Sequence, residues 1–161
     1  SSIKESAFWC CDHLTSVTIG NGVTLIEEDA FWRCEYLTSV TICNGVTTIG
    51  NQAFYYCGNL TSVTIGNSVT SIGEGAFSGC SSLASVTIPD IVTSIGYDAF
   101  YKCSSLKNVY CKPTTPPTGA SWMFDYNASD RKIYVPRASV DAYKSAQYWH
   151  DYASYIVGYD F

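Results

Sequence analysis

The amino-acid sequence predicts a β-rich solenoid, in which 23-residue coils stack on one another and a C-terminal α/β cap closes the stack. The main observation is a motif that returns at a constant spacing of 23 residues. Its copies begin at Leu14, Leu37, Leu60, Leu83 and Leu106. A fixed period of this length is typical of solenoids, because one coil cannot bury its apolar face without neighbours. The second observation is that the motif ends well before the chain does, which predicts a separate terminal cap.

The first part of each coil is predicted to be a strand. In the copy that begins at Leu60, the apolar residues Val63 and Ile65 alternate with Ser62 and Thr64. Alternation of β-branched apolar and polar residues indicates a strand with one buried face. We therefore expect the serine and threonine side chains to point to solvent.

The rest of each coil is predicted to turn, extend briefly and then form a single helical turn. Residues 66–68 read Gly-Asn-Ser, a turn signal, and residues 69–72 form a second short extended segment. Ala76, Phe77 and Cys80 then occupy positions i, i+1 and i+4, as in one turn of α- or 3₁₀-helix. These three side chains are expected to face the core.

Adjacent coils should pair their strands in parallel, about 4.8 Å apart, so that identical residues stack in rows. Two polar rows are expected on the outer face of the strands. The serine row is Ser16, Ser39, Ser62 and Ser85, and the threonine row is Thr18, Thr41, Thr64 and Thr87.

Eight cysteines raise the question of disulfides, but the repeat itself places five of them, each three residues after a phenylalanine. These five are Cys11, Cys34, Cys57, Cys80 and Cys103. A stacked row of this kind suits small buried hydrophobic side chains, so we expect mainly reduced thiols. Cys111 stands at a core isoleucine position, whereas Cys10 and Cys43 fall at outward or turn positions.

Residues 1–110 are predicted to form the solenoid and residues 111–161 the cap. The cap begins with the proline-rich stretch 113–117 and continues with a strand over residues 132–135. Ser139 is the predicted N-cap of a helix that carries apolar residues as far as Trp149. The chain begins in the middle of a coil, and we expect it to be a piece of a longer protein.

Charge and hydropathy exclude some function classes. The net charge is −5 and only 14% of the residues are charged, which argues against the basic footprint of a nucleic-acid-binding protein. No apolar run reaches the roughly 18 residues of a membrane span, and no signal peptide is present in this sequence.

The coil resembles the BspA-type, or Treponema-type, leucine-rich repeat, whose pattern is L-x-x-V-x-I-P, V-x-x-I-G and A-F-x-x-C. The copy over residues 83–103 carries every one of these positions. The segments T-T-P-P-T at 114–118, I-Y-V-P at 133–136 and S-V-D-A-Y-K at 139–144 resemble the C-terminal cap of bacterial members. The resemblance implies a right-handed leucine-rich-repeat coil.

The resemblance also implies a non-catalytic protein-recognition or adhesion module of a bacterial protein that is exposed on the cell surface or secreted. Its expected partner is a protein of the host matrix or of another cell's surface. Two alternatives remain open: a glycan-binding module and a structural spacer. No catalytic residues accompany this family, so no enzyme activity and no cofactor are expected.

The sequence offers few candidates for chemistry. Cys10, Cys11, Asp12 and His13 are adjacent, but they lack the paired C-x-x-C spacing of a zinc site, and Cys11 belongs to the buried row. The acidic run 27–29 is interpreted as a solvated edge and not as a calcium site. We therefore predict neither catalytic nor metal-binding residues.

One exposed row is the candidate for partner binding. The position after each repeat phenylalanine is often aromatic, and one coil adds a second aromatic residue. The row consists of Trp9, Trp32, Tyr55, Tyr56 and Tyr101. Exposed aromatic residues suit protein hot spots and can also stack on sugar rings, although they would equally shield the neighbouring turns. An acidic edge with Glu5, Glu28 and Glu74 is expected beside this row.

Overall fold

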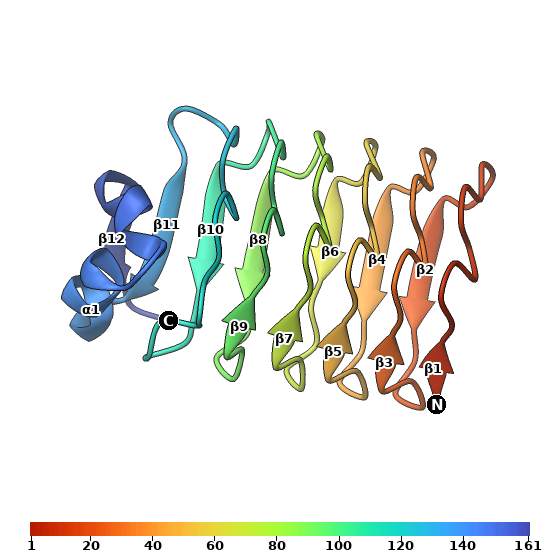
Figure 1. Cartoon of the computed structure of the whole chain (residues 1–161), viewed down its shortest axis with the longest axis horizontal. Coiled ribbons are helices and arrows are strands. Elements are labelled where there is room, and N and C mark those ends of the chain that lie inside the picture. Colours follow the sequence, from red (N-terminus) through yellow and green to blue (C-terminus); the bar gives the residue numbers. More distant parts are fainter.

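The computed structural model describes all residues from Ser1 to Phe161 and confirms the β-rich solenoid. Figure 1 shows the coils stacked along the long axis, with the N-terminus at one end and the helices at the other. Every pair of hydrogen-bonded strands is parallel. This arrangement follows from the constant period, which brings the same part of each coil beside its counterpart.

The strands form three sheets. One face of the solenoid carries the longer strands, in a three-stranded sheet of order β2-β4-β6 and a four-stranded sheet of order β8-β10-β11-β12. These strands are β2 Ser16–Ile19, β4 Ser39–Ile42, β6 Ser62–Thr64, β8 Ser85–Ile88, β10 Asn108–Cys111, β11 Lys132–Pro136 and β12 Ile156–Tyr159. The short second strands form a five-stranded sheet of order β1-β3-β5-β7-β9. They are β1 Ser2–Ile3, β3 Leu25–Ile26, β5 Thr48–Ile49, β7 Ser71–Ile72 and β9 Ser94–Ile95.

The pairing register stacks identical residues, as the sequence predicts. Ser39 pairs with Ser16 and with Ser62, and the threonines two positions later follow the same register. The ladder is interrupted between β6 and β8. In the two coils before it, a threonine just before the strand donates its hydroxyl hydrogen to the preceding coil, as Thr61 does to the Thr38 carbonyl at 3.1 Å. The coil of β8 has Ala84 at this position and lacks that bond.

The core is built around a ladder of phenylalanine rings, one from each coil. Neighbouring rings have centroids 5.0 to 5.5 Å apart and lie within 9° of parallel. The ladder consists of Phe8, Phe31, Phe54, Phe77, Phe100 and Phe124. Backbone bonds such as Phe77 N–H to the Ala99 carbonyl hold this register.

A row of buried thiols runs beside the rings. Each thiol of Cys34, Cys57, Cys80 and Cys103 donates to the phenylalanine carbonyl of the preceding coil, at 3.1 to 3.3 Å. All eight cysteines are free. Burial raises the pKa of the Cys34 thiol to about 11, and it also raises the pKa of Cys57. The prediction of buried, free thiols is confirmed for these four, whereas Cys11, the fifth member of the predicted row, lies in the end coil and is only half-buried.

We expect these four thiols to resist alkylation in the folded protein, because a thiol that is buried and protonated is a poor nucleophile. Cys10 and Cys43 are partly exposed and should react first. Titration with a thiol reagent before and after denaturation measures both groups. Rapid reaction of all eight thiols without denaturant would contradict this expectation.

The predicted one-turn helix is replaced by consecutive turns with left-handed backbone. Two positions in each coil, two residues before and two residues after the core phenylalanine, have positive φ. In the second coil these are Asp29 (φ 54°) and Arg33 (φ 52°), which flank Phe31. Their N–H groups donate to carbonyls of the next coil instead of closing a helical turn. Bonds between coils therefore offset the cost of left-handed backbone, roughly 1–2 kcal/mol per non-glycine residue.

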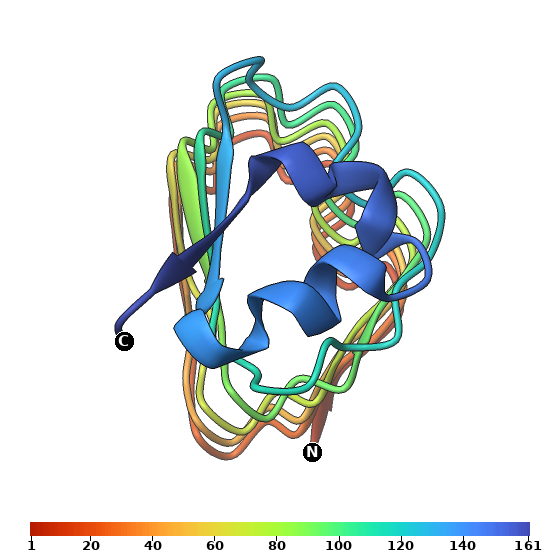
Figure 2. The ribbon, with the colours of Figure 1, turned by 90° about the vertical axis from the view of Figure 1, so that its left-hand side faces the viewer.

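The C-terminal segment covers the last coil. Strand β11 adds to β10 and strand β12 adds to β11, so the sheet continues into this segment. The 3₁₀ helices η1 (Arg137–Ser139) and η2 (Trp149–Tyr155) and the helix α1 (Val140–Ser145) complete it. Figure 2 shows α1 and η2 lying across the end of the solenoid. The division into residues 1–110 and 111–161 remains a proposal for where solenoid and cap meet.

The predicted cap helix begins where expected, with Ser139 as its N-cap, but its capping bond and its end differ from the prediction. Ser139 stands at the N-cap position, but its hydroxyl donates to the Thr114 carbonyl at 2.7 Å and makes no capping bond. The α-helix ends at Ser145, because Ala146 adopts extended backbone. Burial of Trp149 is instead achieved in η2, where its indole N–H donates to the Pro117 carbonyl at 2.8 Å. Contacts with the proline-rich stretch therefore override the helical pattern.

Candidate functional site

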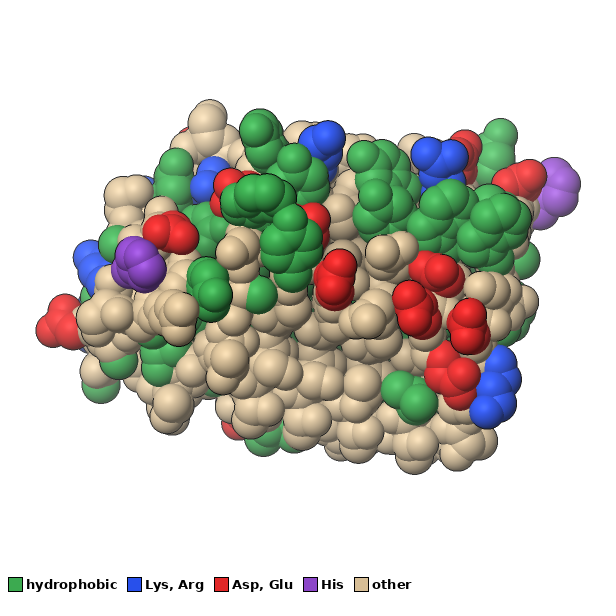
Figure 3. All heavy atoms as spheres, in the orientation of Figure 1, with side chains coloured by type: hydrophobic (Ala, Val, Ile, Leu, Met, Phe, Trp, Pro, Cys, Tyr) green, Lys and Arg blue, Asp and Glu red, His purple; other side chains and the backbone are tan.

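The predicted aromatic row lies on the side of the solenoid formed by the left-handed turns. Trp9 is 53% exposed and Tyr56 is also exposed, whereas Trp32, Tyr55 and Tyr101 are half-buried. Figure 3 shows a band of apolar side chains along the long axis, beside acidic side chains and above a broad area of neutral polar atoms. The side chains point outward because the preceding phenylalanine in each coil points into the core.

Four of the five residues form one continuous stack, which we call the aromatic strip: Trp9, Trp32, Tyr55 and Tyr56. The Trp9 and Trp32 rings are 5.2 Å apart between centroids and 8° from parallel. The Trp32 and Tyr55 rings are 6.0 Å apart, and Tyr56 tilts against Tyr55 at 4.6 Å. Repeat register places three of these rings at one position of successive coils, so they stack without a change in backbone.

The structure separates Tyr101 from the strip. The intervening coil places Ser78, only 2% exposed, at the equivalent position. Tyr101 instead lies against Trp122, at 6.4 Å, and meets the edge of Tyr126 at 5.3 Å. The exposed aromatic residues therefore form two groups with a gap at the fourth coil.

Sequence reasoning missed Trp122 and Tyr126, which are 51% and 68% exposed. They flank Phe124, which continues the phenylalanine ladder after a step of 24 residues from Phe100. A search that allowed one inserted residue would have aligned W-M-F-D-Y with the D-A-F-Y-K of the preceding coil. The strict period of 23 hid this last, degenerate coil.

One side of the aromatic strip is acidic. Burial raises the pKa of the Asp29 carboxyl, and the nearby Glu5 raises it further. The pKa of Asp98 is raised in the same way, first by burial and then by Glu74 and Asp125. One carboxylate oxygen of each aspartate is buried without a hydrogen bond. Asp29 and Asp98 thus have no cationic partner, although Glu27 on the same edge pairs with Lys4 at 3.2 Å.

The opposite side of the aromatic residues carries two cations that the sequence did not single out. The Arg33 guanidinium lies over the Trp32 ring, at 4.9 Å from its centroid, and near the Tyr56 ring, at 5.7 Å. The Lys102 ammonium lies 5.3 Å from the centroid of Tyr101. Such cation–π contacts hold the charged groups at the surface beside the rings. This side is of mixed charge, since Glu35 lies beside the two cations.

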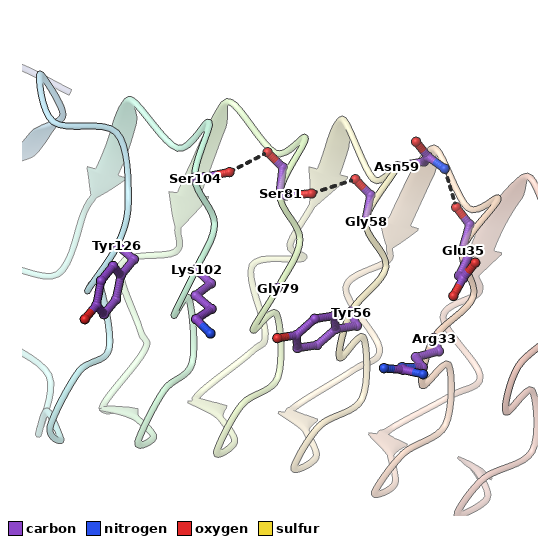
Figure 4. Close-up of a pocket in the computed structure, with 10 residues that line it drawn as sticks. All are labelled: Arg33, Glu35, Tyr56, Gly58, Asn59, Gly79, Ser81, Lys102, Ser104 and Tyr126. Carbon is purple, nitrogen blue, oxygen red and sulfur yellow. Dashed lines mark hydrogen bonds between the residues drawn. The ribbon is translucent and has the colours of Figure 1, made fainter.

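Arg33 and Lys102 line a groove of about 640 Å³ that crosses five coils. Figure 4 shows Arg33 and Tyr56 pointing along the axis toward Gly79. A Cβ atom at Gly79 would lie 2.6 Å from the Tyr56 ring, so glycine is needed for the ring to lie there. The full lining is Arg33, Glu35, Tyr56, Gly58, Asn59, Gly79, Ser81, Lys102, Ser104 and Tyr126.

Other kinds of site are not formed by the side chains. No group of three or more His, Cys, Asp or Glu residues is placed to hold a metal ion. His150 is exposed and contacts Asp151 at 3.2 Å. No helix has the length and apolar character that crossing a membrane requires.

Comparison with known families identifies the repeat. Residues 1–136 match the BspA type leucine rich repeat region, in six copies. No curated protein is similar enough in sequence to serve as a relative.

Solved structures of bacterial leucine-rich repeat proteins share the fold. A leucine rich cell surface protein from Faecalibacterium prausnitzii is 30% identical over 84% of this chain, with a TM-score of 0.66. A leucine-rich repeat protein from Bacteroides ovatus is 28% identical over 97% of this chain, with a TM-score of 0.74. The chain spans 34% and 39% of the lengths of these two proteins.

The T. pallidum leucine rich repeat protein is 24% identical, and the match covers 90% of this chain and 68% of that protein. Its TM-score of 0.70 supports the fold. The 23-residue period, the stacked phenylalanine and cysteine rows and the match over six repeats all lead to one assignment. The chain belongs to the BspA-type leucine-rich repeat family.

Proposed function

We propose that this chain is a non-catalytic recognition module, and that it binds proteins of the host matrix or of another cell's surface. The observation that carries the proposal is the continuous stack of Trp9, Trp32 and Tyr55, with Tyr56 tilted against it, exposed along one side of the solenoid. Large rigid aromatic residues lose little entropy on binding and dominate protein hot spots. Small hydroxyl side chains, which cover the strand face, are under-represented among them.

The proposed location is the bacterial cell surface or the secreted fraction. It is supported by family membership and by the F. prausnitzii relative, which is described as a cell surface protein. A spacer role would require no binding surface at all. Recognition is favoured over a spacer role because the four rings are contiguous, and a contiguous aromatic patch marks an interaction surface more often than scattered apolar residues do.

The test is a paired substitution in the aromatic strip. Trp32→Ala together with Tyr55→Ala should weaken binding to a matrix protein by about 2 kcal/mol or more, as for other aromatic hot spots. Binding is measured by surface plasmon resonance against a panel of immobilised matrix proteins. A thermal melt of the double variant shows whether it stays folded.

The matched control replaces Thr41 and Thr64 by alanine on the strand face, where both side chains are exposed. This pair should leave binding nearly unchanged. Loss of binding in the threonine pair, with full binding in the aromatic pair, would move the site to the strands and refute the proposal.

A further inference from the structure

The groove beside the aromatic strip has a composition that is unusual for a peptide site. Tyr56 and Tyr126 are its only large apolar residues, and the rest of the lining is polar or glycine. Its backbone groups are already paired between coils, as in the bond from Tyr56 N–H to the Ser78 carbonyl at 2.7 Å. Gly79 N–H likewise donates to the Tyr101 carbonyl at 2.8 Å. A peptide would find neither a free strand edge nor pockets for apolar side chains.

The polar lining suits a ligand rich in hydroxyl groups. Ser81 and Ser104 each donate their hydroxyl hydrogen to a backbone carbonyl of the preceding coil, at 3.3 and 3.5 Å. The Asn59 amide N–H group donates to the Glu35 carbonyl at 2.6 Å. The lone pairs of these oxygens are left to accept hydrogen bonds, and Figure 4 shows the three side chains in a row along one wall of the groove. Sugar hydroxyls are suitable donors to such a row.

The two cations in the groove have no carboxylate partner. Arg33 and Lys102 form no ion pair, as is also true of four other cations of the chain, but these two line the same groove. A planar guanidinium binds a carboxylate or sulfate through two parallel hydrogen bonds. Two unpaired cations in one groove therefore suit a ligand that carries negative groups.

The spacing of the groove residues matches a linear polymer. Arg33, Tyr56, Gly79 and Lys102 occupy one position in four successive coils, 23 residues apart. Successive coils are about 4.8 Å apart, a length close to that of one pyranose unit in an extended chain. The aromatic ring of Tyr56 lies between the two cations in this series and can stack on a sugar ring.

We propose that the groove binds a linear acidic polysaccharide. Its carboxylates pair with Arg33 and Lys102, one sugar ring stacks on Tyr56, and sugar hydroxyls bind the row at Asn59, Ser81 and Ser104. This site adjoins the proposed protein-binding surface, since Tyr56 belongs to both and Arg33 lies over the Trp32 ring.

Calorimetry on the full chain tests the proposal with three probes of equal length. These are a hexasaccharide of galacturonic acid, neutral maltohexaose and a hexaglutamate peptide. The acidic hexasaccharide should bind at least about tenfold more tightly than either of the others, since only it combines charge with stacking and hydroxyl groups. Its affinity should fall as salt is added.

Substitutions locate the site. Arg33→Gln with Lys102→Gln should weaken the acidic hexasaccharide by about tenfold or more, because both charge-assisted contacts are lost. Glutamine already occurs at the other left-handed position of a coil, as Gln52 (φ 52°) two residues before Phe54, so a glutamine side chain is compatible with this backbone. The control, Lys132→Gln with Lys144→Gln, removes the same charge from exposed sites outside the groove. It should change affinity less than about twofold.

A sign test completes the experiment. Glu35 lines the groove, so Glu35→Gln should tighten binding of an acidic ligand by removing a like charge. Weaker binding in that variant would overturn the proposal. Equal losses of affinity in the groove variant (Arg33 and Lys102) and in the control variant (Lys132 and Lys144) would overturn it too. Hexaglutamate binding as tightly as the sugar would assign the groove to an acidic peptide, and absence of sugar binding would also refute the proposal. Glu35→Gln and the choice of probe leave Trp32 and Tyr55 unchanged, whereas Arg33→Gln also removes the cation over Trp32, so the double variant is tested for protein binding as well. Loss of sugar binding with protein binding retained would show that the two sites fail independently.

Discussion

Replacing Phe77 with alanine is expected to lower the free energy of unfolding by about 3–5 kcal/mol, as for other buried aromatic residues. The side chain is fully buried, and its ring lies 5.3 Å from both Phe54 and Phe100. Removing it leaves a cavity in the middle of the ladder. The adjacent coils cannot close that cavity easily, because backbone bonds on both sides, such as Phe77 N–H to the Ala99 carbonyl, hold them at the coil spacing.

The control for this prediction is Ser62→Ala on the exposed face of β6. It should change the free energy of unfolding by less than about 0.5 kcal/mol, because it removes neither packing nor a buried polar contact. Denaturant melts of both variants give the comparison. Similar losses for the two would mean that stability does not depend on the ring ladder in the way the packing indicates.

A chain that ends at Tyr110 is expected to aggregate or to lose cooperative unfolding. The deletion removes β11, which pairs with β10, and exposes the hydrogen-bonding edge of β10. It also uncovers Phe100, whose ring stacks on Phe124 at 5.5 Å, and Leu106, which is fully buried in the intact chain. An apolar end with an unpaired parallel edge is a template for association.

Size-exclusion chromatography and thermal melts of the truncated chain measure these outcomes. The matched control ends at Tyr159 and loses only two exposed residues, together with the Arg137–Asp160 ion pair. Surface ion pairs contribute little, so this control should melt like the intact chain. A chain ending at Tyr110 that stays monomeric and melts cooperatively would refute the capping role.

The stacking register was predictable from the sequence because parallel ladders place residues one period apart beside each other. Ser39 beside Ser16, and Phe54 beside Phe31, follow from the number 23 alone. The same argument predicts buried thiols at Cys57 and its counterparts, since the third residue after each core phenylalanine lies one period from the next such cysteine. In a solenoid, residues one repeat apart in the sequence are neighbours in space. The repeat pattern therefore determines most of the core.

The turns were not predictable in this way. The spacing of Ala76, Phe77 and Cys80 is compatible with a helical turn, and most left-handed positions carry residues other than glycine. Arg33 and Tyr56 adopt positive φ because their N–H groups bond to the next coil. Those bonds exist only once the coils are stacked, so the local sequence does not predict the left-handed backbone.

The candidate sites likewise contain some residues that the repeat pattern predicts and others that only the tertiary structure brings together. The sequence by itself determined that Trp9, Trp32 and Tyr55 share one position and one face, because the repeat forces equal positions to align. Only the tertiary structure decided that Arg33 and Lys102 face a common groove, that Tyr56 lies over Gly79, and that Trp122 joins a second aromatic group. The physical reason is that left-handed backbone sets the direction of the Arg33, Tyr56 and Lys102 side chains, and this backbone forms only when the coils stack. Trp122 escaped the sequence pattern because one inserted residue shifts the last coil out of the 23-residue period.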